Sequence, residues 1–139
     1  ALYVVIYAPM QMAADLPQNY EGHPAFQFIL DVPTDWDKSI AINGEIGEYI
    51  TMARKDVNSD DWYLGSITNE KGRSMTVSFS FLEPNKSYNA TIYKDPNGGG
   101  WLKNPEEVVI ENMVVDYTTL YTMNLPEGGG QAIKFTPVK

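Results

Sequence analysis

The sequence contains no cysteine and only one histidine, His23, among its 139 residues. Without cysteine, disulfides, thiolate nucleophiles and cysteine-ligated zinc sites are excluded. A single histidine argues against a histidine-based metal site or a Ser-His-Asp triad.

Basic residues are also scarce: 10 Lys and Arg stand against 18 Asp and Glu, which gives a net charge of -8. This balance argues against nucleic-acid binding, which needs a basic face to neutralise phosphates. It also disfavours an anionic membrane surface. Neutral ligands such as sugars remain compatible with it. The 43% hydrophobic content and the length are enough for one domain with a real core.

The segment 1–14 is nearly all apolar and has no Lys or Arg. A signal peptide would need a basic region before its apolar run. A membrane span would need roughly 20 apolar residues, and Asp15 and Pro17 end this run early. We therefore expect a helix that is buried over most of its circumference, with Pro9 as a kink. Such a helix needs cover on several sides, which favours a segment cut from a longer chain.

A second short helix is expected from Pro24 to Leu30, with proline in its first turn. Phe26, Ile29 and Leu30 would form its buried stripe.

After Pro33 the apolar residues change to a two-residue period, which is typical of half-buried strands. The clearest case is 74–81, where Met75, Val77 and Phe79 alternate with polar residues. Turn residues at 58–61 between two strands indicate a hairpin. This pattern predicts an antiparallel sandwich or barrel of seven or eight strands. The expected strands are 38–43, 49–53, 62–68, 74–81, 88–93, 108–115, 119–125 and 131–136.

Several motifs follow one another in a fixed order along the chain. They are ALYVVIYAPMQMAADLP (1–17), NYE (19–21), FQFI (26–29), DVPT (31–34), GEIGEY (44–49), AR (53–54), WYLG (62–65), FL (81–82) and GGG (128–130). Together they resemble the end of the catalytic barrel and the C-terminal domain of glycoside hydrolase family 97. The resemblance spans essentially the whole chain.

The resemblance implies a three-part bacterial enzyme with an N-terminal β-sandwich, a (β/α)8 barrel and a C-terminal β-domain. The family includes inverting α-glucosidases and retaining α-galactosidases, with calcium near the active site of the barrel. Its members are mostly exported to the periplasm. The catalytic motifs lie upstream of this chain, so we expect no catalytic, cofactor-binding or metal-binding residue here.

In this interpretation, residues 1–33 are the terminal helical segment of the barrel. Residues 34–139 form an antiparallel β-sandwich, a non-catalytic accessory domain that packs on the barrel, stabilises it and can mediate oligomerisation. The expected partners are the barrel and, through the exposed N-terminal helix, a second copy.

Two carboxylate patterns offer weaker alternatives. Glu45 and Glu48 could form a glycosidase pair, but a three-residue spacing at a strand turn favours solvated charges. Asp56, Asn58 and Asp60 have the spacing that opens an EF-hand loop, but the loop lacks the later Gly and Glu. A hairpin turn explains these residues better, because Asx side chains favour turns.

The tryptophans support an alternative function, a carbohydrate-binding module for the α-glycoside substrate of the parent enzyme. Trp101, Trp62 and Trp36 are the candidate residues for stacking against sugar rings. Aromatic residues inside strands are more often part of a core or an interface. Trp101 follows a glycine-rich loop and is the best candidate for an exposed platform.

Overall fold

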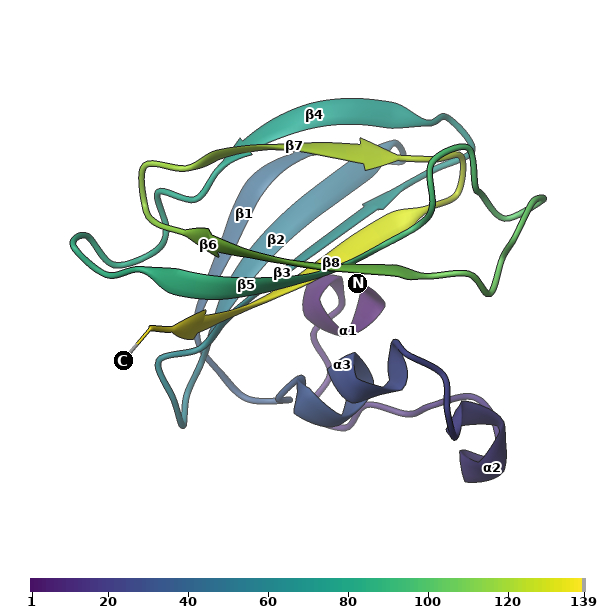
Figure 1. Cartoon of the computed structure of the whole chain (residues 1–139), viewed down its shortest axis with the longest axis horizontal. Coiled ribbons are helices and arrows are strands. Elements are labelled where there is room, and N and C mark those ends of the chain that lie inside the picture. The colour runs from purple at the N-terminus through teal and green to yellow at the C-terminus, as the bar shows by residue number, and fades with distance from the viewer. Residues whose placement is uncertain (139) are drawn as a thin grey trace.

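The computed structural model describes residues 1–138, which form eight antiparallel strands in two sheets and three short helices. Figure 1 shows the larger sheet between a small sheet on one face and the helices on the other. The six-stranded sheet has the order β1 (Trp36–Glu45), β2 (Tyr49–Asp56), β3 (Trp62–Thr68), β8 (Gly130–Pro137), β5 (Tyr88–Lys94) and β6 (Val109–Val115). The two-stranded sheet pairs β4 (Arg73–Ser78) with β7 (Leu120–Leu125).

The predicted antiparallel β-architecture is confirmed, and each expected strand range overlaps one strand of the structure. The expected hairpin is β2–β3, in which Tyr49 lies opposite Thr68. One boundary is wrong: β4 ends at Ser78, whereas the alternating pattern continues to residue 81. The chain turns there because the Leu82 amide bonds back to the Phe79 carbonyl at 2.9 Å. The alternating pattern marks which side chains are buried, and it persists through this turn.

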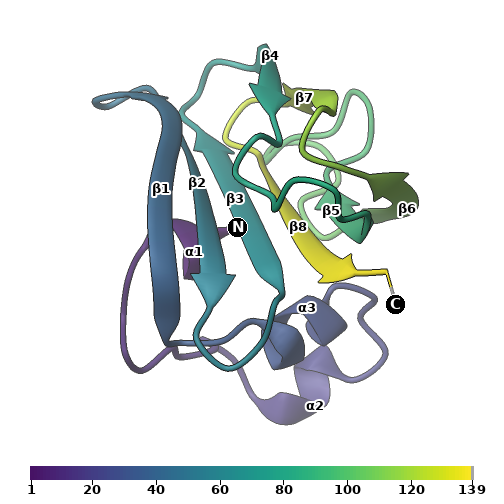
Figure 2. The same cartoon turned by 90° about the vertical axis from the view of Figure 1, so that its left-hand side faces the viewer.

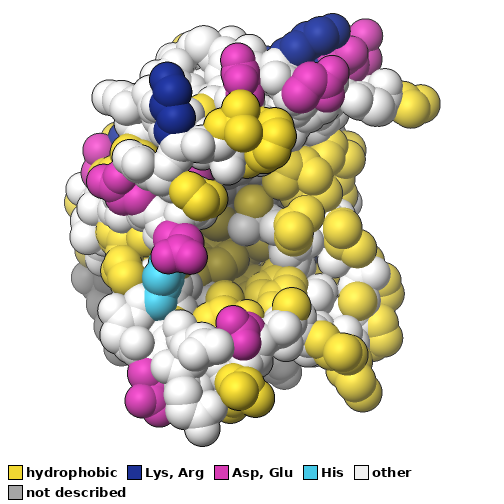
Figure 3. Space-filling model, turned by 90° about the vertical axis from the view of Figure 1, so that its right-hand side faces the viewer, with side chains coloured by type: hydrophobic (Ala, Val, Ile, Leu, Met, Phe, Trp, Pro, Cys, Tyr) yellow, Lys and Arg dark blue, Asp and Glu magenta, His cyan; other side chains and the backbone are white. Residues whose placement is uncertain are grey.

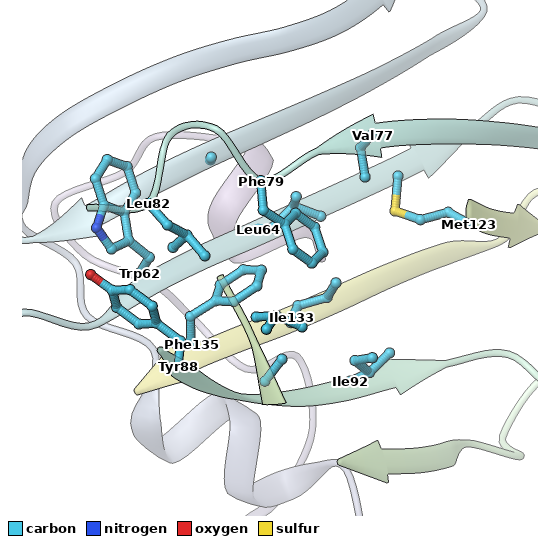
Figure 4. Packing of buried hydrophobic residues seen from close by; sticks show 13 residues of the cluster. Trp62, Leu64, Val77, Phe79, Leu82, Tyr88, Ile92, Met123, Ile133 and Phe135 are labelled. Carbon is cyan, nitrogen blue, oxygen red and sulfur yellow. The ribbon is translucent and has the colours of Figure 1, made fainter. Parts of the chain in front are cut away.

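The main core lies between the two sheets, where side chains of the large sheet meet those of β4 and β7 (Figure 4). Aromatic rings form much of it. The Phe79 and Phe135 rings meet edge to face with centroids 4.9 Å apart, the arrangement that aromatic quadrupoles favour. The buried members are Ala53, Trp62, Leu64, Val77, Phe79, Leu82, Tyr88, Ala90, Ile92, Val115, Met123, Ile133 and Phe135.

The N-terminal segment differs from the expected long helix. Helix α1 spans only Leu2–Val5, and Ile6 is already extended. Pro9 prevents the helix from continuing, because proline lacks an N–H and disfavours helical geometry in the residue before it. Within 1–14 only Val4 is buried in this chain. The prediction of one long helix over this segment is therefore wrong, while its cover by the rest of a longer chain stays a prediction.

The other two helices follow proline-containing turns. Helix α2 (Pro17–Tyr20) begins at the proline that we expected only to end a helix, and Pro is indeed favoured in a first turn. Helix α3 (Phe26–Asp31) confirms the second expected helix with a shift of one or two residues. Phe26 and Ile29 of the predicted stripe are half-buried, but Leu30 is exposed and the buried residue is Phe28, so the stripe is only partly correct. None of the helices within 1–138 is long and apolar enough to cross a membrane.

Candidate interface site

A second, smaller apolar cluster lies on the face of the large sheet opposite the main core. We call residues 1–33 the N-terminal layer. Figure 2 shows its helices on this face, with α1 behind the sheet and α2 and α3 below it. The buried residues that join the layer to the sheet are Val4, Phe28, Tyr63, Tyr93 and Ala132. The central strands β3 and β8 are therefore buried on both faces, with a different partner on each.

Arg54 on β2 is a cation that lies almost completely buried, 6% exposed, beneath α1. Its Nε donates to the Val4 carbonyl at 2.5 Å, and its Nη2 donates to the Val5 carbonyl at 3.4 Å. Its Nη1 donates to the Ser39 hydroxyl oxygen at 2.7 Å. Carbonyls at the end of a helix have no partner within the helix. Arg54 supplies the missing donors and fixes α1 to the sheet.

Aromatic rings complete the environment of this guanidinium. The Arg54 Cζ lies 5.7 Å from the centroid of the Trp36 ring and 5.9 Å from that of Tyr7. These separations fall within the range of cation–π attraction. Burial lowers the pKa of Arg54, and the Tyr7 phenol opposes this shift. Since arginine starts from a very high pKa, the group stays charged at neutral pH.

Helix α3 is held by Tyr63 and Lys134. The Tyr63 phenol donates to the Asp31 carbonyl at 2.9 Å, and Lys134 Nζ lies 3.0 Å from an Asp31 carboxylate oxygen. The Phe28 ring meets the Tyr63 and Tyr93 rings at centroid distances of 6.1 and 5.2 Å. Burial, followed by nearby carboxylates, raises the pKa of Tyr63 and keeps its phenol protonated as a donor.

Gly65 on β3 allows α1 to approach the sheet closely. A Cβ at this position would lie 2.7 Å from the Ala1 carbonyl oxygen and 2.8 Å from Val4 Cβ. Both distances are too short for van der Waals contact, and neither atom belongs to a flexible side-chain end. The WYLG motif drew attention to this residue only through the family resemblance. A glycine inside an apolar strand is the local signal of close backbone approach.

The outer side of the N-terminal layer is apolar and exposed. A hollow of about 700 Å³ lies between the layer and the sheet, and Leu2 and Met12 of the layer are among the residues that line it. Figure 3 shows hydrophobic side chains lining a hollow beside the single histidine. Singly exposed apolar residues are ordinary, whereas several large ones within one short segment favour an interaction surface. The exposed large apolar residues of the layer are Leu2, Ile6, Tyr7, Met10, Met12, Leu16 and Leu30.

The three tryptophans lie in different environments. Trp62 is 2% exposed in the main core, so its ring offers no face to a sugar. Trp36 is half-buried and packs edge-on against Tyr63 at 5.6 Å. Trp101 is 60% exposed beside a hollow of about 380 Å³. Sugar stacking stays a prediction, and Trp101 is the candidate with an accessible ring.

The carboxylate patterns belong to turns. Glu48 forms ion pairs with Arg73 and Lys71, while Glu45 lies at the other end of the same turn and accepts the Glu48 amide through its carbonyl. The Asp56 carboxylate accepts the Asn58 amide at 3.1 Å, an Asx turn that shapes the β2–β3 connection. Within residues 1–138 no group of three or more His, Asp or Glu side chains is arranged to hold a metal ion.

The fold defines a class: an antiparallel β-domain of two sheets with a layer of short helices on one face. The family model described as "Glycosyl-hydrolase 97 C-terminal, oligomerisation" matches residues 35–136. The chain belongs to this family and is a non-catalytic C-terminal domain.

Individual relatives agree. The chain is 39% identical over 135 residues to a retaining alpha-galactosidase of Bacteroides thetaiotaomicron, covering 96% of this chain and 20% of the relative. A glycoside hydrolase family 97 enzyme of a Pseudoalteromonas species, solved with acarbose, matches with a TM-score of 0.95 and 46% identity over 99% of this chain and 22% of that one. A beta-arabinopyranosidase shares the fold with a TM-score of 0.72 at 22% identity. The chain thus spans about a fifth of these relatives.

Proposed function

We propose that this chain is the accessory domain of an α-glycosidase, in which it packs on the catalytic barrel, stabilises it and takes part in subunit contact. One observation supports the packing role above others: the N-terminal layer is two-sided. Its inner side is fixed to the sheet by Arg54, Tyr63 and Lys134. Its outer side exposes large apolar residues. Covering them would contribute about 25 cal/mol per Å² of apolar area.

The proposal assigns residues 1–33 to the barrel and residues 34–139 to the C-terminal domain, of which Lys139 lies outside the described residues. The family model supports this division, because its match begins at residue 35. The structure adds that β1 begins at Trp36, directly after the layer.

For the parent enzyme we propose hydrolysis of α-galactosides or α-glucosides, in the periplasm or after export. The name of one relative, a retaining alpha-galactosidase, supports α-galactosides. The α-glucosides come from the family resemblance. The calcium expected from the resemblance would lie in the barrel, outside this chain.

Turnover of p-nitrophenyl α-galactoside and α-glucoside, with calcium, tests the non-catalytic role. We expect activity in the full-length protein and none in the 139-residue chain. Activity in the isolated chain would contradict the proposal.

A pair of matched variants tests the packing. Ile6 in the layer is 57% exposed, and Val57 in the β2–β3 turn is 51% exposed. We expect Ile6→Lys to lower the melting temperature of the full-length protein, because the lysine would meet the barrel, while Val57→Lys leaves it unchanged. In the isolated 139-residue chain we expect neither variant to change the melting temperature. Equal effects of the two variants in the full-length protein would argue against packing through this side.

A second candidate function, sugar binding, is favoured by the exposed ring of Trp101 beside its hollow. An aromatic face next to polar loop groups is a suitable platform for a sugar ring. The proposed ligand class is the α-glycoside substrate of the parent enzyme.

A further inference from the structure

The two edges of the six-stranded sheet, β1 and β6, are built differently. Figure 2 shows them at opposite ends of the sheet. Free strand edges invite pairing with another chain, and proteins usually block them with bulges and charges. β1 has both protections. Its register with β2 shifts between Trp36 and Lys38 and again between Ala41 and Asn43, and it exposes Asp37 and Lys38.

β6 has neither protection. Its seven residues pair with β5 without a register shift. Its outer edge meets no other strand within residues 1–138. The strand contains no proline or basic residue, and its exposed side chains include Ile110, Met113 and Val114. Its one charge, Glu111, is 2.7 Å from Lys94 of β5 and is therefore neutralised within the domain. A regular, apolar, charge-compensated edge is suited to pairing.

We propose that β6 pairs antiparallel with β6 of a second copy, so that two six-stranded sheets join into one. The inference rests on the proposed function, which includes a subunit contact, and on the oligomerisation role in the family description. It names the strand that makes the contact. A symmetric pair of this kind is isologous, since the same surface serves both subunits.

The sequence of β6, VIENMVV, suits a two-fold axis at Asn112. In that register Ile110 faces Val114 of the second copy, and Glu111 faces Met113. The two Glu111 residues are thus not directly opposite each other, which avoids a destabilising pair. Ile110 and Val114 are four residues apart and lie on the same face of the strand. Two apolar cross-strand pairs therefore form on one face of the joint.

The mass of the full-length protein by light scattering tests this inference. The double variant Ile110→Lys and Val114→Lys places lysine opposite lysine, so we expect the oligomer mass to fall by half. The double variant Ile110→Glu and Val114→Lys places glutamate opposite lysine, so we expect the wild-type mass. Val57→Lys is the control for a lysine at an exposed valine and should also keep the wild-type mass.

Cross-linking gives a second measurement, which does not require the contact between the two β6 strands to be broken. Asn112→Cys would lie opposite its own copy, within the separation that a disulfide requires. We expect a disulfide between two copies of the residue-112 peptide, identified by mass spectrometry. Val114→Cys is the matched control, because the two copies would be about 13 Å apart along the strands, and it should not cross-link.

The outcomes separate the two levels of the proposal. A monomeric wild-type protein would refute the subunit contact and, with it, the β6 pairing. An oligomer that survives the double-lysine variant, or that is lost equally in the glutamate–lysine variant, would overturn the β6 pairing alone. Absence of the residue-112 disulfide in an oligomeric protein would overturn it as well.

Discussion

The Nε of Arg54 donates to the carbonyl oxygen of Val4 at 2.5 Å, across 50 residues of sequence. This bond joins β2 of the sheet to the last turn of α1. It is charge-assisted and buried, which makes it stronger than a neutral bond. The relationship between a strand arginine and helix-end carbonyls thus sets how the N-terminal layer sits on the domain.

We expect Arg54→Met to lower the free energy of unfolding by about 1–3 kcal/mol, since it leaves the Val4 carbonyl and the Ser39 hydroxyl without their donor. Urea unfolding measures the loss, and hydrogen exchange of residues 1–14 shows whether the layer loosens. Lys38→Met is the control, because Lys38 is exposed on β1. Equal losses in the two variants would show that Arg54 does not fix the layer.

We expect Gly65→Ala to destabilise the domain by about 1–3 kcal/mol, the usual cost of overpacking. The new Cβ would overlap the Ala1 carbonyl and Val4, so α1 must move away from β3. Hydrogen exchange should show faster exchange at α1, while the main core keeps its protection. Unchanged exchange at α1 would contradict the close approach as the reason for glycine.

The strands could be predicted from sequence because one face of each is buried and the other is wet. In 74–81 this alternation gave the buried residues Val77 and Phe79 correctly. It failed at the strand end, since a turn can keep the same inward side chains. The two-residue alternation of apolar residues therefore predicts which side chains are buried better than it predicts where the hydrogen bonding of a strand ends.

The site was harder to predict, for two physical reasons. An apolar run does not distinguish a long helix from a segment that leaves the helix after one turn, and in 1–14 the helix ends at Val5. The role of Arg54 depends on a contact 50 residues away, which no local pattern reveals. The family resemblance included Arg54 and Gly65 within motifs but gave neither a role.

Acid should destabilise the domain through Asp116. Hydrogen bonds from the Thr118 hydroxyl and amide, which outweigh the opposing effect of burial, hold the pKa of this carboxyl below its usual value. Its contribution to stability is therefore complete above the unfolded pKa of about 3.9, and it is lost as the pH falls through the lower folded-state pKa.

The urea concentration at the unfolding midpoint should fall between pH 7 and pH 3. We expect this fall to be smaller in Asp116→Asn than in the wild type. Asp35→Asn is the control, because Asp35 lies on the surface of the connection before β1. If both variants lose as much stability in acid as the wild type, Asp116 does not contribute to the pH dependence.

Replacing Trp62 by alanine should destabilise the domain strongly, whereas the same change at Trp101 should have little effect on its stability. Trp62→Ala opens a cavity in the main core and should cost about 3–5 kcal/mol. Trp101 is mostly exposed, so Trp101→Ala should change the free energy of unfolding by less than about 0.5 kcal/mol. Urea unfolding of both variants makes the comparison, and a large loss for Trp101→Ala would show that its loop is part of the core.

The stable Trp101→Ala variant then distinguishes the two functions. Titration with galactosides and maltooligosaccharides, followed by tryptophan fluorescence, should give a saturable change in the wild type if Trp101 stacks on sugar. The same titration should give none in Trp101→Ala, because the stacking ring has gone while the fold remains. A wild-type domain that shows no saturable change would remove the sugar-binding function. The packing role would then stand alone, since it depends on the N-terminal layer and not on this loop.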